Sequence, residues 1–186
     1  MGKTLTEPGT ASKQEQRRPE NPLRICFVCT GNTCRSPMAA AVANFLSRQL
    51  LDALPDAVKE SVPPPTVAFS AGLYAVTGEP ISAYAALSLE EAGIVPTAEQ
   101  DYRKHSAHTL SHEEAQGYDL LVGMTSSHTM ELFLRFPDLA TRITCLPVEI
   151  SDPYGGSAEV YRQCLAQIIQ GVKQLLLRER DGIGNA

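Results

Sequence analysis

The stretch LRICFVCTGNTCRSP, residues 23–37, runs from a mostly apolar segment through a polar turn into the start of a helix. The apolar segment, residues 23–28, suits a short strand that is buried on both faces of a parallel sheet. Pro37 fits the first turn of a helix, and apolar side chains then recur at helical spacing as far as Leu50. We therefore predict a strand, a loop and a helix in direct succession.

The loop itself, residues 29–36, has the character of a phosphate-binding loop. Free backbone N–H groups converge where a loop enters a helix, and the positive end of the helix dipole lies behind them. Gly31 and Asn32 tolerate the left-handed conformations of a curled anion nest, and Arg35 carries a planar fork that matches two phosphate oxygens. The predicted phosphate-binding residues beside Arg35 are Thr30, Gly31, Asn32, Thr33, Cys34 and Ser36.

Cys29 begins this loop and is the predicted nucleophile. The helix dipole and the guanidinium of Arg35 would favour the thiolate, which is the nucleophilic form of cysteine. The hydroxyl of Ser36 could donate to that thiolate or could cap the helix. A Cys-x5-Arg pattern alone is weak, so the prediction depends on its place between strand and helix; the loop fits neither nucleotide-binding glycine motif.

The rest of the chain continues the alternation of strands and helices. Strands are predicted at residues 67–70, 119–124 and 143–146, and helices at 81–92, 126–136 and 157–180. Residues 54–66 include four prolines and are expected to form a connection with at most a frayed helix at its start. This order predicts the α/β class, with a four-stranded parallel sheet and helices on both faces.

The predicted organisation is a single catalytic domain over residues 22–181. The chain has 186 residues, 43% of them hydrophobic, which is enough for one sizeable core and short for two domains. Residues 1–21 contain almost no large apolar side chain and are predicted to be a disordered tail, and residues 182–186 form a C-terminal end.

Charge and hydropathy exclude several kinds of partner. The net charge of −5 comes without a basic patch, so no nucleic-acid partner is expected. No stretch approaches the roughly 20 apolar residues of a membrane span. The five cysteines are odd in number and three of them crowd into residues 26–34, which indicates thiol chemistry in a reducing, cytoplasmic setting. The oligomeric state is left open.

At the loop, the sequence resembles the low-molecular-weight protein-tyrosine-phosphatase family. The resemblance continues in Ser70-Ala71-Gly72 and Asp152-Pro153-Tyr154 and covers about residues 23–180. It implies the low-molecular-weight phosphatase fold, a phosphocysteine intermediate, phosphorylated proteins as substrates and no cofactor. Asp152 would be the general acid and base, and Tyr154 one wall of the substrate cleft. Taken alone, Asp-Pro is more often a turn, and Tyr154 would be a partly buried loop aromatic.

Position 33 is informative about the substrate. Tyrosine-specific members of the family commonly carry an apolar residue there, whereas this chain has Thr33. Gly155 also stands where a second aromatic residue commonly follows the first. The loop and the Asp-Pro-aromatic-Gly-Gly-Ser segment look like the bacterial protein-arginine phosphatase branch, so we predict phosphoarginine on proteins, with phosphotyrosine as the alternative. Arsenate reductases share the fold but need a late resolving pair, for which only Cys145 and Cys164 are available. A non-enzymatic anion sensor on this fold would lack one of the catalytic residues, whereas this chain has Cys29, Arg35 and Asp152.

Several cysteines and histidines admit a plainer interpretation. Cys34 either packs as a small side chain or forms a reversible disulfide with Cys29, and the sequence leaves both open. Cys26 and Cys29 are spaced as a redox or zinc pair, but Cys26 belongs to a strand and no second pair exists. Cys145 and Cys164 are expected to be isolated core residues. Three histidines lie in a segment that we expect to be solvated, so no metal site is predicted; they are His105, His108 and His112.

Overall fold

The computed structural model describes residues 21–59, 62, 64–96 and 100–183. Its strands are β1 (Arg24–Cys29), β2 (Val67–Gly72), β3 (Leu120–Gly123) and β4 (Ile143–Cys145). Its α-helices are α1 (Arg35–Asp52), α2 (Asp56–Lys59), α3 (Ala83–Glu91), α4 (His112–Gln116), α5 (Ser126–Arg135) and α6 (Ala158–Ile183), and two 3₁₀ helices are η1 (Tyr102–Lys104) and η2 (Pro137–Arg142). The predicted tail and C-terminal end lie outside the described residues, except for Asn21 and positions 182 and 183.

The four strands form one parallel sheet in the order β2-β1-β3-β4. The predicted α/β class and the four-stranded parallel sheet are therefore confirmed. β1 is an inner strand that pairs with β2 and β3, so Cys29 lies beside Gly72 and Val28 lies beside Gly123. Because all strands run the same way, the segments that leave them meet at one edge of the sheet.

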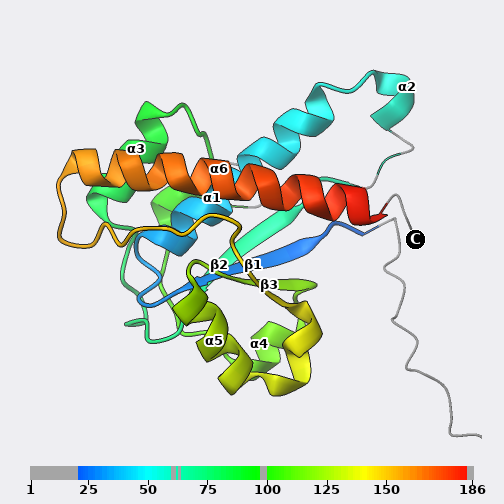
Figure 1. The fold of residues 1–186 in the computed structure, drawn as a ribbon. Helices are drawn as coiled ribbons and strands as arrows, with labels where there is room; N and C mark the ends of the chain where they lie inside the picture. The colour runs from blue at the N-terminus through cyan, green and yellow to red at the C-terminus, as the bar shows by residue number, and fades with distance from the viewer. Residues whose placement is uncertain (1–20, 60–61, 63, 97–99, 184–186) are drawn as a thin grey trace, which may run out of the picture.

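Helices cover both faces of the sheet (Figure 1), as the sequence predicts. One core lies between the sheet and the helices α1, α3 and α6, and it includes Ile25 and Phe27 of β1. The smaller core on the other face lies against α4 and α5 and includes Cys26 and Val28. These four side chains are fully buried, which explains why β1 reads as an apolar run without alternation.

Asn44 on α1 forms hydrogen bonds with the backbone of β2, the strand at one side of the sheet. β2 is an edge strand, so one side of its backbone has no neighbouring strand. The buried side-chain amide of Asn44 donates to the carbonyl of Ala68 at 2.8 Å and accepts from the N–H of Ala68 at 2.9 Å. This side chain therefore takes the place of a missing strand at one position of β2.

Element boundaries differ from prediction where local signals are short. β2 continues to Gly72, two residues beyond the predicted end, because those residues still pair with β1. The predicted helix over 81–92 appears as α3, and Gly93 has the expected left-handed backbone with φ of 69°. α4 and the two 3₁₀ helices are not predicted; α4 spans only 5 residues, which is too short for a helical repeat to show.

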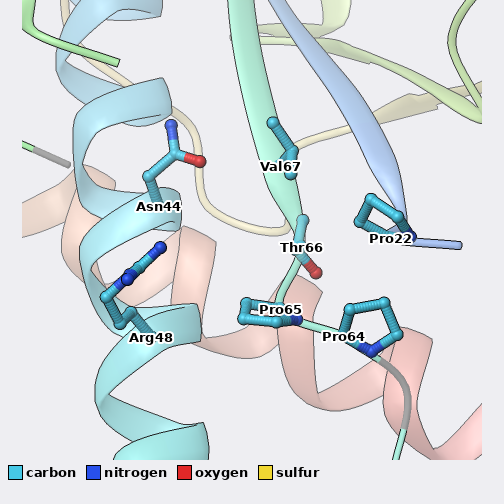
Figure 2. A pocket seen from close by; sticks show the side chains of 7 residues that line it. All are labelled: Pro22, Asn44, Arg48, Pro64, Pro65, Thr66 and Val67. Carbon is cyan, nitrogen blue, oxygen red and sulfur yellow. The ribbon is translucent and has the colours of Figure 1, made fainter. Parts of the chain in front are cut away.

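A pocket of about 200 Å³ opens at the amino edge of the sheet, between α1 and the approaches to β1 and β2. Figure 2 shows Asn44 and Arg48 of α1 on one side and three prolines and the start of β2 on the other. Its lining residues are Pro22, Asn44, Arg48, Pro64, Pro65, Thr66 and Val67. The pocket lies at the opposite end of β1 and β2 from Cys29 and Gly72. Among the described helices, none has both the length and the apolar character that crossing a membrane requires.

Candidate active site

The predicted phosphate loop lies at the carboxyl edge of the sheet, between the end of β1 at Cys29 and the start of α1 at Arg35. Asn32 adopts the left-handed conformation with φ of 57°, as expected for a curled loop. Of the two residues that tolerate this conformation, Asn32 adopts it, and Gly31 is not among the residues with positive φ. The loop leads directly into α1, where Ser36 and Pro37 are buried in the first turn.

The sulfur of Cys29 is buried, with 2% of the residue exposed, and it has two polar neighbours. The hydroxyl of Ser36 lies 3.0 Å from Sγ, and the backbone N–H of Asn32 donates to Sγ at 3.3 Å. The Asn32 N–H is a donor to this sulfur, whereas either partner could donate in the contact between Ser36 and Cys29. Of the two roles considered for Ser36, the geometry matches a bond to Cys29; the residue at the helix cap is Cys34, whose side chain makes no capping bond.

Asn32 organises the loop through a network of hydrogen bonds. Its buried side-chain nitrogen donates to the hydroxyls of Ser36 and Ser70, each at 3.0 Å. Its side-chain oxygen accepts from the backbone N–H of His108 at 3.1 Å, and its carbonyl oxygen lies 2.6 Å from Nε2 of His105. A buried amide with all these partners fixes the loop in one conformation.

Gly72, at the end of the Ser70-Ala71-Gly72 segment, allows the loop to lie against β2. A Cβ atom at this position would lie 2.8 Å from the carbonyl oxygen of Thr30 and 3.2 Å from Cβ of Asn32. The backbone beyond Gly72 also supports the loop, since the N–H of Leu73 donates to Cys29 and that of Tyr74 donates to Thr30, both at 2.9 Å. Glycine is therefore required here for close approach.

Arg35 and Asp152 meet at the mouth of the loop although 117 positions separate them in the sequence. Nη2 of Arg35 donates to Oδ2 of Asp152 at 2.7 Å; the Arg35 side chain is 9% exposed and that of Asp152 is 54% exposed. The other carboxylate oxygen accepts from the backbone N–H of Tyr154 at 3.2 Å. Tyr154 itself is 79% exposed, so the partly buried alternative for this side chain is wrong.

Cys34 lies under the loop and contacts two hydroxyl groups from other elements. Its sulfur lies 2.9 Å from Oγ of Ser82 and 3.3 Å from the hydroxyl of Tyr161. Burial, together with the bond to Cys34, raises the pKa of Tyr161 to about 12. Thr33 lies beside this group, where its carbonyl oxygen accepts from the N–H of Ser82 at 2.8 Å. All five cysteines are free thiols.

His128 on α5 contacts the loop and is absent from the predicted site residues. The residue is 7% exposed, and Nε2 of its ring lies 3.0 Å from Oγ1 of Thr30. Burial, reinforced by the nearby Arg35 guanidinium, lowers the pKa of His128 to about 4. No local motif marks this histidine, because α5 joins the site only through the order of the strands.

The predicted solvated histidine segment needs a correction. His105 is partly buried against the loop, and burial lowers its pKa. His108 is also partly buried, with Nε2 3.0 Å from Glu114, and this bond raises its pKa. Only His112 of the three is exposed. The described part of the chain contains no group of three or more His, Cys, Asp or Glu side chains that could hold a metal ion.

The remaining cysteines differ in burial. Cys26 lies in β1 as predicted, and burial raises the pKa of its thiol well above the ordinary value. Cys164 is buried as predicted, and burial raises the pKa of its thiol to about 12. Cys145 is only partly buried, so its expected place in the core is wrong. Cys145 is the last residue of the short strand β4, whose last two residues are partly buried.

A buried sulfur with polar donors, a buried guanidinium and a carboxylate suits nucleophilic attack on a phosphate group. The comparisons with known proteins agree with this chemistry. Residues 24–181 match the family described as low molecular weight phosphotyrosine protein phosphatase. A protein-arginine-phosphatase of Geobacillus stearothermophilus is 35% identical over 148 residues, covering 76% of this chain and 85% of the relative. The low molecular weight protein-tyrosine-phosphatase PtpB of Staphylococcus haemolyticus is 30% identical, covering 82% of this chain and 97% of the relative.

Solved structures give the same result. A low molecular weight protein tyrosine phosphatase from T. tengcongensis superposes with a TM-score of 0.70 at 32% identity, covering 84% of this chain and 99% of the other. A cysteine-to-serine variant of the YwlE arginine phosphatase, which carries a phosphorylated active-site serine, superposes with a TM-score of 0.68 at 26% identity. The superposed part covers 85% of this chain and 96% of the chain of the YwlE variant.

Proposed function

This chain belongs to the low molecular weight phosphotyrosine protein phosphatase family, and we propose that it removes phosphate from phosphoarginine side chains of proteins, with Cys29 as nucleophile. The observation that carries the proposal is the contact of the buried Cys29 sulfur with Ser36 and the Asn32 N–H inside the loop. The serine phosphorylated in place of the active-site cysteine of YwlE supports covalent catalysis by the residue at this place.

The proposed reaction has two steps. The Cys29 thiolate attacks phosphorus, a sulfur–phosphorus bond forms, and the bond from phosphorus to the guanidinium nitrogen breaks. Asp152 in its protonated form gives its proton to the departing nitrogen. The carboxylate then takes a proton from a water molecule that attacks the phosphocysteine, which releases inorganic phosphate and regenerates the Cys29 thiolate.

Arg35 has a double role in this proposal. A guanidinium carries five N–H donors, so Arg35 can hold phosphate oxygens while one donor remains on Asp152. The 2.7 Å bond between the two residues supports this, because it keeps the general acid beside the phosphate site although its loop is exposed. We infer that the loop amides and Arg35 together stabilise the charge that develops on the phosphate in both steps.

The preference for phosphoarginine rests on Thr33 and on the arginine phosphatase relative. Thr33 makes the wall of the loop smaller and more polar than the apolar residue common in tyrosine-specific members. The exposed Asp152 could also bond the guanidinium of the substrate. Phosphotyrosine stays the alternative, because PtpB, a tyrosine phosphatase, is similar to this chain over nearly its whole length.

Steady-state kinetics with matched phosphoarginine and phosphotyrosine peptides tests the substrate. We expect a higher kcat/KM for phosphoarginine, and a Thr33→Ile variant should shift the ratio toward phosphotyrosine. A conservative Thr33→Ser variant serves as the control, since it retains the hydroxyl and should retain the preference. Faster phosphotyrosine hydrolysis by the unmodified protein, with no shift in the Thr33→Ile variant, would establish the alternative.

An arsenate reductase on this fold is less well supported. Cys145 lies at the end of β4, while Cys164 lies in the core on α6, where its thiol donates to the carbonyl of Ser151 at 3.5 Å. We therefore favour hydrolysis, which needs no resolving cysteine. We also propose a cytoplasmic location, because five free thiols suit a reducing compartment.

A further inference from the structure

His128 bridges the phosphate loop and the start of α5, and the proposed reaction gives it no role. Its Nδ1 atom lies 2.7 Å from Oγ1 of Thr125, and its Nε2 atom lies 3.0 Å from Oγ1 of Thr30. Thr125 is the residue at the cap of α5, and its Oγ1 also accepts from the backbone N–H of His128. Thr30 directly follows the nucleophile and is exposed at the rim of the loop.

The direction of these bonds follows from the donors available. A neutral imidazole has one N–H and one acceptor nitrogen. Thr125 already accepts the backbone N–H of His128, so its own hydroxyl hydrogen is free to go to Nδ1. Nε2 then carries the ring hydrogen and donates it to Oγ1 of Thr30. In this arrangement the hydroxyl oxygens of Thr125 and Thr30 and both ring nitrogens of His128 have a partner.

The opposite direction is less favourable. If Nδ1 carried the hydrogen, Oγ1 of Thr125 would accept twice, and its hydroxyl hydrogen would have no acceptor in this group. The hydroxyl hydrogen of Thr30 would also point at the imidazole and away from the mouth of the loop.

We propose that His128 is a positioning residue that accepts from Thr125, donates to Thr30 and thereby turns the hydroxyl hydrogen of Thr30 toward a bound oxyanion. The inference rests on the proposed function of the loop. It adds a side-chain donor to the loop amides and Arg35, and it links the start of α5 to the residue after Cys29.

The charges around the ring agree with this role. Arg35 and Asp152 are the charged groups that act on His128, and the larger of their two effects, that of Arg35, opposes protonation. Burial opposes it further, and His128 therefore keeps one acceptor nitrogen under physiological conditions. A protonated ring would have two N–H groups and could not accept from Thr125.

A double-mutant cycle on the full chain tests the proposal. Thr30→Val removes the hydroxyl, and His128→Asn keeps a group near Thr125 but is too short to reach Thr30. Each single variant should bind inorganic phosphate about tenfold more weakly in calorimetric titration, because each loses one oriented hydrogen bond to a charged ligand. The double variant should bind no more weakly than either single one.

Rescue variants separate positioning from general damage. His128→Gln can present an amide N–H near the place of Nε2, and Thr30→Ser keeps the hydroxyl, so both should bind phosphate within about twofold of the unmodified protein. Ser127→Ala, at an exposed position in the first turn of α5, serves as the matched control. Thermal unfolding of each variant shows whether weaker binding follows from lost stability.

Two outcomes would overturn the inference. Unchanged phosphate affinity of the Thr30→Val protein would show that this hydroxyl does not contact the anion. Additive losses in the double variant would show that His128 acts by another route. Either result leaves the proposed function intact, whereas that function itself fails if the unmodified protein does not bind phosphate.

Discussion

One buried asparagine contacts the parallel sheet near the amino ends of its strands and another near their carboxyl ends, and the two side chains have different partners. At the amino edge, Asn44 bonds to the backbone of β2 at Ala68 and completes an edge strand. At the carboxyl edge, Asn32 bonds to the hydroxyls of Ser36 and Ser70. Burial of a polar side chain costs free energy unless the side chain forms hydrogen bonds, and both asparagines form them. Asn44 maintains the fold, whereas Asn32 orients groups that face Cys29.

The largest effect is expected at the centre of the carboxyl edge. Cys29→Ser should lower kcat on the order of a thousandfold or more, because a hydroxyl is a far weaker nucleophile than a thiolate. Its affinity for inorganic phosphate should remain, since the loop amides and Arg35 are unchanged. Stopped assays with an aryl phosphate and calorimetric titration measure the two quantities. Substantial residual turnover would remove Cys29 from its proposed role.

Gly72→Ala should produce the next largest effect. The added Cβ would meet the carbonyl oxygen of Thr30 at 2.8 Å, so the loop must move. We expect a loss of unfolding free energy of about 1–3 kcal/mol, as for overpacking, and a fall in kcat/KM of roughly a hundredfold, as for a misplaced catalytic group. Gly78→Ala is a control with free space around the new Cβ, although its φ of 93° adds backbone strain. It should lose stability but keep activity at temperatures where it is folded.

Substitution of the two asparagines tests the comparison directly. Asn32→Ala should lower kcat/KM by about tenfold to a hundredfold, because the loop loses the amide that holds Ser36. Asn44→Ala should lower the unfolding free energy by about 2 kcal/mol, because Ala68 loses its partners, with kcat/KM unchanged. Urea unfolding and steady-state kinetics on both variants are sufficient. Equal losses of kcat/KM in the two variants would contradict the comparison, because Asn44 would then matter for activity as much as Asn32.

The smallest effect is expected in the dependence of stability on pH. The pKa of His128 falls from an ordinary value of 6.5 to about 4 on folding, mainly through burial. The unfolded chain therefore binds the proton more readily, and this contribution is present above pH 6.5 and is lost as the pH falls toward 4. His128→Gln should lose less stability than the unmodified protein in urea unfolding between pH 6.5 and 4.5.

His108 provides the opposite case for comparison. The bond to Glu114 raises its pKa, so its contribution is present below pH 6.5 and is lost as the pH rises through the folded value. His108→Gln should therefore be relatively less stable in acid. The same sign of change in both variants would contradict the assigned directions.

The sequence predicts the part of the site that is contiguous in the chain. The apolar run of β1, the polar loop and Pro37 are local signals, and the structure places Cys29, Asn32 and Arg35 together as expected. Asp152 required the family resemblance, because nothing local shows that it meets Arg35 across 117 positions.

The residues missed by prediction come from other elements and have no motif of their own. His128, Ser82 and Tyr161 reach the loop only because the sheet brings their helices to its carboxyl edge. An isolated histidine or tyrosine in an amphipathic helix has the same appearance whether it packs in a core or touches a site. The alternatives for Cys34 illustrate this limit, since its hydroxyl partners become visible only in three dimensions.

The strand order has a consequence for synthesis on the ribosome. β1 is made before both of its neighbouring strands, so Cys29 leaves the ribosome before either strand that flanks it. Asp152 and the covering helix α6 follow more than a hundred residues later. A nascent chain therefore exposes the Cys29 thiol long before the helix that covers the loop has been made. For this reason oxidants should reach the Cys29 thiol of the growing polypeptide more easily during that interval than in the folded protein.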